Sequence, residues 1–199
     1  MGLRTFLGLK KRSSHPPIAA VSPVRPQPAQ GGNVPSAWER RQNLVYMHHV
    51  AAIVRFVARD AESIVDIGTA GYPYLEWFDW IPRKVSIDLK RPYRSAHVEG
   101  IKSDFLALSV TEKFDCALCL QTMEHVPEAE RFAKKLTEIA SRVIVSVPYL
   151  WAAGTVKGHV HDPVDEEKVE RWFGRKPDLQ LISTEMNRTR RLIAYFEGR

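Results

Sequence analysis

Apolar runs bounded by polar turns divide this chain into expected strands and helices. In the run Ser63–Ile67, the residues Ile64, Val65 and Ile67 hardly alternate with polar ones, which is typical of a central parallel strand covered on both faces. Four further β-rich runs follow, at 85–88, 98–103, 114–120 and 142–147. Segments with helical spacing lie between and after them. This alternation predicts an α/β domain with a doubly wound, mostly parallel sheet.

Helical periodicity predicts the helices that cover this sheet. A capping box at Ser36 and Glu39 begins an expected helix that continues to about Arg59. The Tyr46 side chain could reach a bound ligand, as could two histidines beside it, but a place on the helix surface is the favoured interpretation. Shorter helices are expected at 73–78 and 127–140, the second with a clear apolar stripe.

The C-terminal part predicts one more helix and two closing strands. Asp162 is the expected N-cap, Pro163 lies in the first turn, and Gly174 marks the expected end. The runs 179–184 and 191–196 then predict an antiparallel pair of strands. The expected sheet therefore has seven strands.

The composition changes near residue 36 and divides the chain into a tail and a domain. Residues 1–35 hold five basic residues, six prolines and no acid, which predicts a disordered, basic, Pro-rich tail. The remaining 24 basic and 23 acidic residues nearly balance, so most of the net charge of +6 belongs to the tail. Residues 36–199 are expected to form one domain. A near-neutral domain argues against nucleic-acid binding.

Apolar residues among the first basic ones leave two interpretations of the tail open. Leu3, Phe6 and Leu7 beside Arg4 and Lys10 could touch an anionic membrane surface, while a solvated basic arm is the favoured alternative. The apolar part is too short for a secretory signal. No run in the sequence reaches the length that spans a bilayer.

The two cysteines bear on compartment and metal binding. Cys116 and Cys119 lie three positions apart on an expected strand, so their side chains point to opposite faces and cannot share an ion. Buried, reduced thiols are typical of a reducing compartment, and we expect a cytoplasmic protein. No other Cys/His pair has zinc spacing, so the sequence predicts no metal site.

Polar residues follow the expected strands at their carboxyl ends, where ligands bind in open parallel sheets. Asp66 lies near the end of the first strand, and Gly68 and Gly71 in the following turn let a ligand approach the backbone closely. Asp88 ends the second strand about 20 residues after Gly68, where a nucleotide-binding fold places the acid that binds ribose hydroxyls. Polar residues recur after the third and fourth strands, at Asp104 and Gln121.

These residues resemble those of the class I S-adenosylmethionine-dependent methyltransferases. The resemblance covers about 63–148 and rests on 65–68, Asp88, Asp104 and 114–126. The last segment looks most like the branch of that family with a Glu-His-Val turn after the fourth strand. The resemblance implies a Rossmann-like fold with an antiparallel C-terminal strand, S-adenosylmethionine as cofactor, and methyl transfer as the activity.

The resemblance also implies which residues would contact the nucleoside of the cofactor. Asp88 would hold the ribose hydroxyls, and Leu89 would lie against the adenine. Asp104 would face the adenine amino group, with Phe105 beside it.

At the other end of the cofactor, Gly68, Thr69 and Ala70 would line the methionine part, and Gln121 would close the floor. Ala70 and Tyr72 stand where the family usually has glycine. This departure favours a second interpretation, a catalytically inactive binding or scaffold protein. A third interpretation, a nicotinamide-dependent oxidoreductase, lacks two of the three glycines that pyrophosphate binding needs.

Histidines near the strand ends are the candidate catalytic residues. Methyl transfer to a hydroxyl requires that its proton leave, and a histidine can accept that proton near neutral pH. The loop after the fifth strand, residues 149–161, is called the late loop. His125 after the fourth strand and His161 in the late loop are the predicted catalytic residues, with His159 as an alternative for acceptor binding. Each of them could instead hydrogen-bond its own turn. Glu124 is expected to fix its turn rather than act as a base.

Aromatic residues near the late loop bear on the acceptor. Tyr149 and Trp151 lie in that loop, and Trp172 follows in the last helix. Aromatic faces stack on planar or sugar-like groups, although such residues also close small cores. The expected acceptor is a hydroxyl or amine of a small molecule, sugar or glycan.

Overall fold

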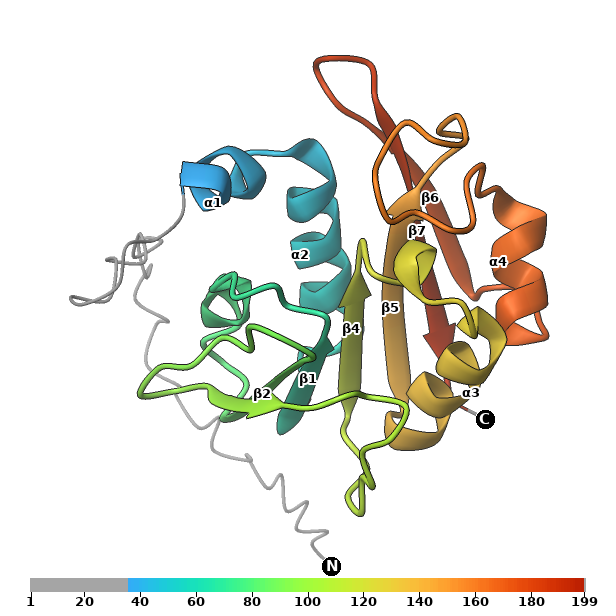
Figure 1. The fold of residues 1–199 in the computed structure, drawn as a ribbon. Helices are drawn as coiled ribbons and strands as arrows, with labels where there is room; N and C mark the ends of the chain where they lie inside the picture. Colours follow the sequence, from blue (N-terminus) through green and yellow to red (C-terminus); the bar gives the residue numbers. More distant parts are fainter. Residues whose placement is uncertain (1–35, 199) are drawn as a thin grey trace, which may run out of the picture.

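A seven-stranded mixed sheet with helices on both faces forms the domain (Figure 1). The structure is a computed structural model, and it describes residues 36–198. The expectations for the tail, disorder and membrane contact, concern residues outside this range. Within it, no helix is both long and apolar enough to cross a bilayer.

The strand order is β3-β2-β1-β4-β5-β7-β6. The five parallel strands are β1 (Ser63–Ile67), β2 (Arg83–Asp88), β3 (Glu99–Lys102), β4 (Cys116–Leu120) and β5 (Arg142–Pro148). β7 (Arg190–Glu197) runs antiparallel to β5, and β6 (Leu179–Thr184) runs antiparallel to β7. The predicted α/β class, the mostly parallel sheet and the antiparallel C-terminal strand are confirmed.

Two apolar layers lie on opposite faces of the sheet, as β4 illustrates. Leu118 and Leu120 of β4 pack with α1 (Ser36–Gln42), α2 (Val45–Val57) and the 3₁₀ helix η1 (Tyr74–Trp77). Ala117 and Cys119 pack with α3 (Ala129–Ile139) and α4 (Glu166–Phe173) on the other face. Because all five residues of β4 are buried, a run without alternation is what this central strand requires. Cys116 and Cys119 are both free and buried, in different layers.

The long helix expected from Ser36 to Arg59 is instead two helices. Leu44 has extended backbone angles between α1 and α2. The start of α2 is capped from far away in the sequence, because Glu185 accepts hydrogen bonds from the backbone amides of Val45 (2.7 Å) and Tyr46 (3.1 Å). A contact across 140 residues leaves no local sequence signal, so the helical spacing alone predicts one continuous helix.

Two further local predictions need correction. The segment expected as a helix at 73–78 forms only the short 3₁₀ helix η1. The N-cap of α4 is Asp165 rather than Asp162, and its side chain accepts a hydrogen bond from the Lys168 amide. The end of α4 at Gly174, which has a left-handed φ of 66°, is as predicted.

Candidate functional site

The strand order of the sheet reverses between β1 and β4, and a turn follows each of these two strands. In open parallel sheets, ligands bind at such a reversal, outside the carboxyl ends of the strands. The turn after β1 contains Gly68, and the turn after β4 contains Thr122. A Cβ atom on Gly68, whose φ is 87°, would lie 2.3 Å from the Thr122 Oγ1 atom. The two turns therefore touch, and only glycine fits at this contact.

Asp66 is a fully buried acid beside this contact. No well-formed hydrogen bond joins its carboxylate oxygens or the neighbouring Tyr74 hydroxyl to a described residue, although Tyr74 and Thr69 lie close enough to Asp66 to favour its charged form. Burial raises the pKa of Asp66 to about 7, against smaller opposing effects of Tyr74 and Thr69. Buried polar atoms normally have partners, so an acid in this state at a strand end indicates a ligand site.

Asp88 at the end of β2 holds the glycine turn in place. Its Oδ2 atom accepts a hydrogen bond from the Ala70 amide (2.8 Å), and its Oδ1 atom accepts from the amides of Lys90 and Arg91 (2.7 Å each). Burial opposes the charged form, but these hydrogen bonds outweigh it, and the pKa of Asp88 is lowered. The Oδ2 atom keeps one lone pair for a ligand, because each carboxylate oxygen accepts about two hydrogen bonds.

Gln121 follows β4 with a left-handed φ of 54°. Its amide nitrogen donates to Ser146 Oγ on β5 (3.2 Å), and its oxygen accepts from Arg191 Nε on β7 (3.2 Å). Gln121 thus joins three neighbouring strands at their carboxyl edge, and its place in the floor of a cofactor site stays a prediction.

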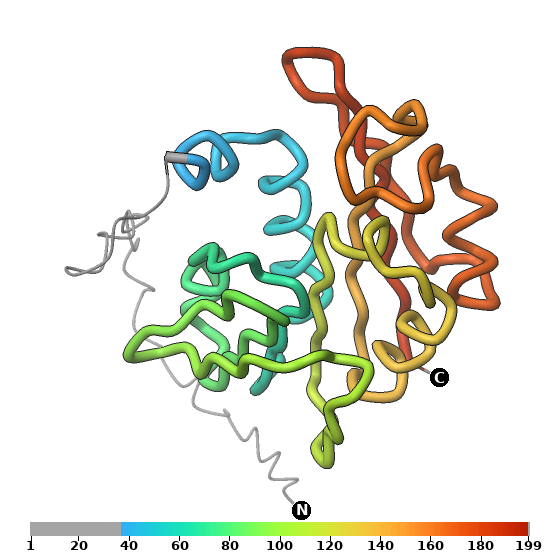
Figure 2. Tube along the Cα trace, in the orientation of Figure 1, coloured from blue at the N-terminus to red at the C-terminus, as the bar shows by residue number. Residues whose placement is uncertain are grey.

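The late loop lies next to the turn after β4 (Figure 2). The backbone amide of Val160 donates to the carbonyl oxygen of Glu124 in the 3₁₀ helix η2 (Met123–His125), at 2.9 Å. As a result the His125 and His159 rings meet edge to face, with centroids 4.6 Å apart. The structure therefore brings His125 together with His159 rather than with His161.

His161 lies on the other side of the η2 turn. Its Nε2 atom is 2.7 Å from the Val126 carbonyl oxygen, and its ring packs on Trp172 with centroids 5.1 Å apart. Trp172 itself is 6% exposed and belongs to the core beside α3. In this position His161 supports the loop, and Trp172 closes the core rather than contacting an acceptor.

Comparison with solved structures shows which fold this is. An N-methyltransferase NodS from Bradyrhizobium japonicum, in complex with S-adenosylhomocysteine, is 12% identical, with a TM-score of 0.63 over 81% of this chain and 96% of that one. A 1,6-didemethyltoxoflavin-N1-methyltransferase from Burkholderia thailandensis, with 1,6-didemethyltoxoflavin and S-adenosylhomocysteine bound, is 14% identical to this chain. Its TM-score is 0.67, over 81% of this chain and 82% of that one. The chain has the fold of the class I methyltransferases.

A third similar structure is the N-terminal domain of EvdMO1 in the presence of S-adenosylhomocysteine and D-fucose. It is 14% identical, with a TM-score of 0.55 over 76% of this chain and 82% of that one. No family model and no curated protein matches the sequence. The likeness therefore lies in the three-dimensional arrangement, and it establishes the fold.

Within the methyltransferase fold, the predicted nucleoside residues have different surroundings. Leu89 is 61% exposed after β2. Asp104 is exposed and accepts a hydrogen bond from the Leu106 amide (2.9 Å). Phe105 is instead a core residue, 4% exposed, with its ring 4.8 Å from that of Phe132 on α3.

Of the residues expected at the methionine end, Thr69 and Ala70 serve the turn itself. The Thr69 side chain is buried, and its Oγ1 atom lies 2.5 Å from Ser86 Oγ on β2. Ala70 has a left-handed φ of 53° and offers its amide to Asp88. Tyr72 turns away to stack on Trp38 of α1, with centroids 5.7 Å apart, so its bulk does not fill the turn.

The N-terminal helices contribute residues that the sequence did not assign to the site. Tyr46 was expected on the helix surface, but it is fully buried and its hydroxyl has no partner among the described residues. The guanidinium groups of Arg41 and Arg191 lie over the Tyr46 ring, at 5.7 and 4.6 Å from its centroid. The Nε atom of Arg41 is also buried without a described partner. Only the split between α1 and α2 places these groups here.

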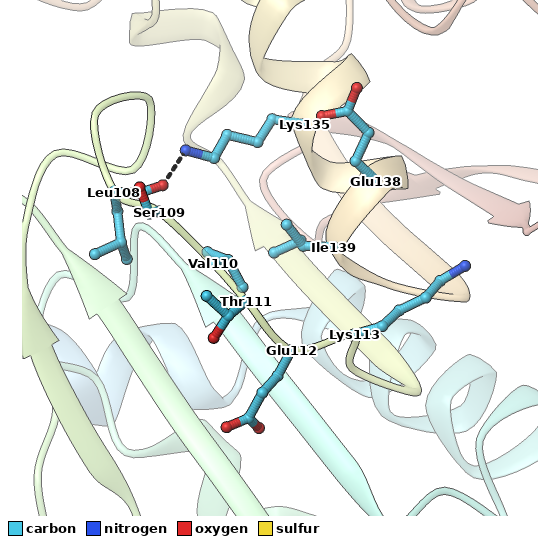
Figure 3. A pocket seen from close by; sticks show the side chains of 9 residues that line it. All are labelled: Leu108, Ser109, Val110, Thr111, Glu112, Lys113, Lys135, Glu138 and Ile139. Atoms are coloured by element: carbon cyan, nitrogen blue, oxygen red, sulfur yellow. Dashed lines mark hydrogen bonds between the residues drawn. The ribbon is translucent and has the colours of Figure 1, made fainter.

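A hollow of about 410 Å³ lies away from these residues, between the segment that precedes β4 and the C-terminal half of α3 (Figure 3). Residues 108–113 and Lys135 are in its lining, and Lys135 donates a hydrogen bond to the Leu108 carbonyl oxygen. Because this segment enters β4 at the amino end, the hollow is at the opposite edge of the sheet from the site.

Proposed function

We propose that this protein is an S-adenosylmethionine-dependent methyltransferase that acts on a hydroxyl or amine of a small-molecule, sugar or glycan acceptor in the cytoplasm. One observation carries the proposal. The buried Asp66 carboxylate and the Tyr74 and Tyr46 hydroxyls make no well-formed hydrogen bond to a described residue, and they lie close to one another near the carboxyl end of β1. That is the ligand position of this fold.

The residues at this position fit the chemical groups of the cofactor. The Asp66 carboxylate suits the ammonium group of the methionine part, and the Arg41 guanidinium suits its carboxylate. The remaining lone pair of Asp88 Oδ2 suits one ribose hydroxyl. The exposed Leu89 side chain offers an apolar surface for the adenine. The ammonium, carboxylate, ribose and adenine groups of the cofactor thus each have a complementary residue.

The chemistry divides between the cofactor and the chain. When bound, S-adenosylmethionine supplies a methyl carbon that bonds to a lone pair of the acceptor, while the carbon–sulfur electron pair remains on sulfur and the acceptor loses a proton. The chain aligns the two molecules through the floor at Gln121 and excludes water. We assign the departing proton to His125 or His159, whose rings meet edge to face after β4 and in the late loop.

The wall formed by the late loop favours a small, planar or sugar-like acceptor. The Trp151 ring stacks near His159, with centroids 6.0 Å apart, and the Arg191 guanidinium lies 5.6 Å from the centroid of Trp151. Aromatic faces bind such groups. A structure with the same fold, that of the N-terminal domain of EvdMO1, was determined in the presence of S-adenosylhomocysteine and D-fucose, in keeping with a sugar.

Calorimetric titration with S-adenosylmethionine and S-adenosylhomocysteine, with NADH as the control ligand, tests the proposal. Both sulfur compounds should bind and NADH should not. Asp88→Asn should weaken binding at least about 10-fold, since the carboxylate both shapes the turn and contacts the ribose. Asp115→Asn is the matched control, because Asp115 also accepts backbone amides, from Glu62 and Ser63, at the amino edge of the sheet. If neither S-adenosylmethionine nor S-adenosylhomocysteine binds, the proposal is refuted.

One alternative is a binding protein without turnover. Ala70 supports it, because this alanine stands where the family usually has glycine and has a left-handed φ of 53°. A protein that binds S-adenosylhomocysteine, yet transfers no labelled methyl group to any of a panel of sugars, phenols and amines, would favour this alternative.

A further inference from the structure

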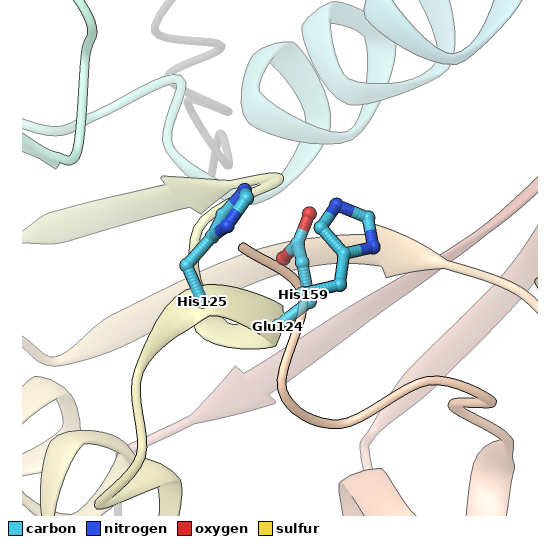
Figure 4. Close-up of side chains that lie close together, drawn as sticks. All are labelled: Glu124, His125 and His159. Atoms are coloured by element: carbon cyan, nitrogen blue, oxygen red, sulfur yellow. The ribbon is translucent and has the colours of Figure 1, made fainter. Parts of the chain in front are cut away.

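Three side chains with metal-binding atoms converge beside the proposed cofactor site (Figure 4). Glu124 and His125 come from η2, and His159 comes from the loop after β5. One ligand atom of each lies within 4.8 Å of those of the other two. Sequence spacing could not reveal the group, because 34 positions separate His125 from His159 and the hydrogen bond from Val160 to Glu124 brings them together.

Both histidines are held in the orientation that a metal ligand needs. The His125 Nδ1 atom lies 2.9 Å from the Gly158 carbonyl oxygen, which can only accept, so Nδ1 carries the hydrogen. The His159 Nδ1 atom lies 2.6 Å from Asp162 Oδ2 in the same way. In the neutral state each ring therefore keeps its Nε2 lone pair for a ligand. Metal-bound histidines typically donate their other N–H to a carbonyl or carboxylate in this way.

The carboxylates in this group provide a second, independent observation. Glu124 is 1% exposed, and its Oε2 atom has no hydrogen-bond partner among the described residues. The Asp162 side chain is also 1% exposed, and its Oδ1 atom has no described partner either. A buried carboxylate oxygen without a donor is unfavourable, and a bound cation would remove that cost.

We propose that Glu124, His125 and His159 bind a divalent transition-metal cation, with Asp162 orienting His159. Two imidazole nitrogens and one carboxylate suit zinc, manganese, iron or cobalt better than calcium, which prefers oxygen ligands only. Three protein ligands also leave coordination positions open, as in catalytic rather than structural sites. The sequence predicts no metal site because no Cys/His pair in it has the spacing of a zinc site, and Glu124, His125 and His159 do not form such a pair.

The role of the cation rests on the proposed function. The site lies on the acceptor side, where the Trp151 ring stacks near His159. A divalent cation lowers the pKa of a hydroxyl that it contacts and orients it. The acceptor proton could then pass to solvent, and the oxygen lone pair would form the new bond to the methyl carbon. In a protein without the cation, His159 and Asp162 would instead act as a proton-accepting pair.

The test begins with metal binding alone. Purified full-length protein, treated with EDTA and dialysed, is titrated with Mn²⁺ while free Mn²⁺ is followed by electron paramagnetic resonance. One Mn²⁺ per chain should bind. Glu124→Gln and His159→Gln should weaken binding at least about 10-fold, and Asp162→Asn by about 10- to 100-fold, the usual range for groups that orient a ligand. His97→Gln, an exposed histidine between β2 and β3, should have no effect.

A second measurement does not depend on whether the variants fold. Co²⁺ added to the unmodified protein should give the visible absorption bands of a four- or five-coordinate site, and Zn²⁺ should displace them. No Mn²⁺ or Co²⁺ binding, or binding that the Glu124 and His159 variants share with the wild type, would overturn the proposal and leave the His159–Asp162 pair as the base.

Titration with S-adenosylhomocysteine in EDTA separates this proposal from the proposed function. If S-adenosylhomocysteine binds and metals do not, the metal site alone is wrong. If metals bind, but S-adenosylhomocysteine binds neither in their presence nor in their absence, the methyltransferase proposal is wrong and the metal site stands.

Discussion

The Glu185 carboxylate accepts a hydrogen bond from the backbone amide of Tyr46, across 139 positions of the chain. Glu185 lies after β6, is 5% exposed, and also pairs with Arg191 Nη1 at 3.1 Å. It therefore joins the start of α2 to the C-terminal hairpin. This contact fixes where α2 begins, and with it the position of Tyr46 near the site.

Replacing Glu185 should accordingly destabilise the whole domain. Glu185→Ala leaves the half-buried Arg191 without its carboxylate and the amides of Val45 and Tyr46 without an acceptor, so we expect a loss of about 3 kcal/mol in the free energy of unfolding. Urea denaturation measures it. Glu112→Ala removes an exposed ion pair with Arg83 and should change stability by less than about 1 kcal/mol. Equal effects of the two substitutions would contradict the capping role.

The contact between the two site turns predicts a steric effect at Gly68. Gly68→Ala places a methyl group against Thr122 and also strains a φ of 87°. Gly154→Ala is the matched control, because Gly154 has a φ of 80° and nothing within 4 Å of the added Cβ atom. Gly68→Ala should lower the free energy of unfolding by about 1–3 kcal/mol more than the control does. Similar losses in thermal or urea unfolding would mean that only the backbone angle matters.

Ala70 should be less favourable than glycine at its position. Its φ of 53° costs an alanine roughly 1–2 kcal/mol, and the extra flexibility of an unfolded glycine offsets about 0.5–1 kcal/mol of that. We expect Ala70→Gly to raise the free energy of unfolding by about 0.5–1 kcal/mol. Ala107→Gly, at a residue without positive φ, should lower it. If Ala70→Gly is destabilising, the alanine methyl group makes a contact that stabilises the turn.

The buried Asp66 predicts how stability depends on pH. Its pKa in the folded protein, about 7, lies above the ordinary value of 3.8, so the folded state holds the proton more tightly than the unfolded chain. Its contribution is then fully present below about pH 4 and is lost as the pH rises through 7. Asp66→Asn removes this dependence, and its stability relative to the wild type should increase by on the order of 3–4 kcal/mol between pH 4 and 8.

Thermal unfolding of both proteins across that range measures the effect. The change with pH in the stability of Asp66→Asn relative to the wild type should be smaller when S-adenosylmethionine is present, since the ligand ammonium would favour the charged carboxylate. A constant difference from pH 4 to 8 would mean that Asp66 titrates normally in the folded protein.

Much of the fold could be predicted because its signals are local. The apolar residues of β1 hardly alternate with polar ones because both faces of that strand are covered, and the apolar stripe along α3 reflects burial on one face. The end of α4 at Gly174 could be predicted because glycine adopts the left-handed φ of a helix end without strain. The glycine turn and Asp88 were placed correctly because their spacing follows from the βαβ geometry.

Errors arose where a distant residue competes with a local pattern. Phe105 follows β3 as a cofactor-contacting residue would, yet it packs on Phe132, because α3 covers that edge of the sheet. The expected N-cap at Asp162 is buried against His159 instead, and Asp165 caps the helix. Tyr46 was placed on the surface of a single long helix.

By itself, the sequence determined the order and kind of the strands, the main helices, and the acids and glycines at the strand ends, since each depends on residues within one or two turns of the chain. Only the tertiary structure decided which of the polar residues meet. The pairing of His125 with His159 depends on a loop hydrogen bond to Glu124, and the burial of Asp66 depends on how the layers close over β1. Such contacts join distant segments, and their geometry is set by the packing of the whole domain.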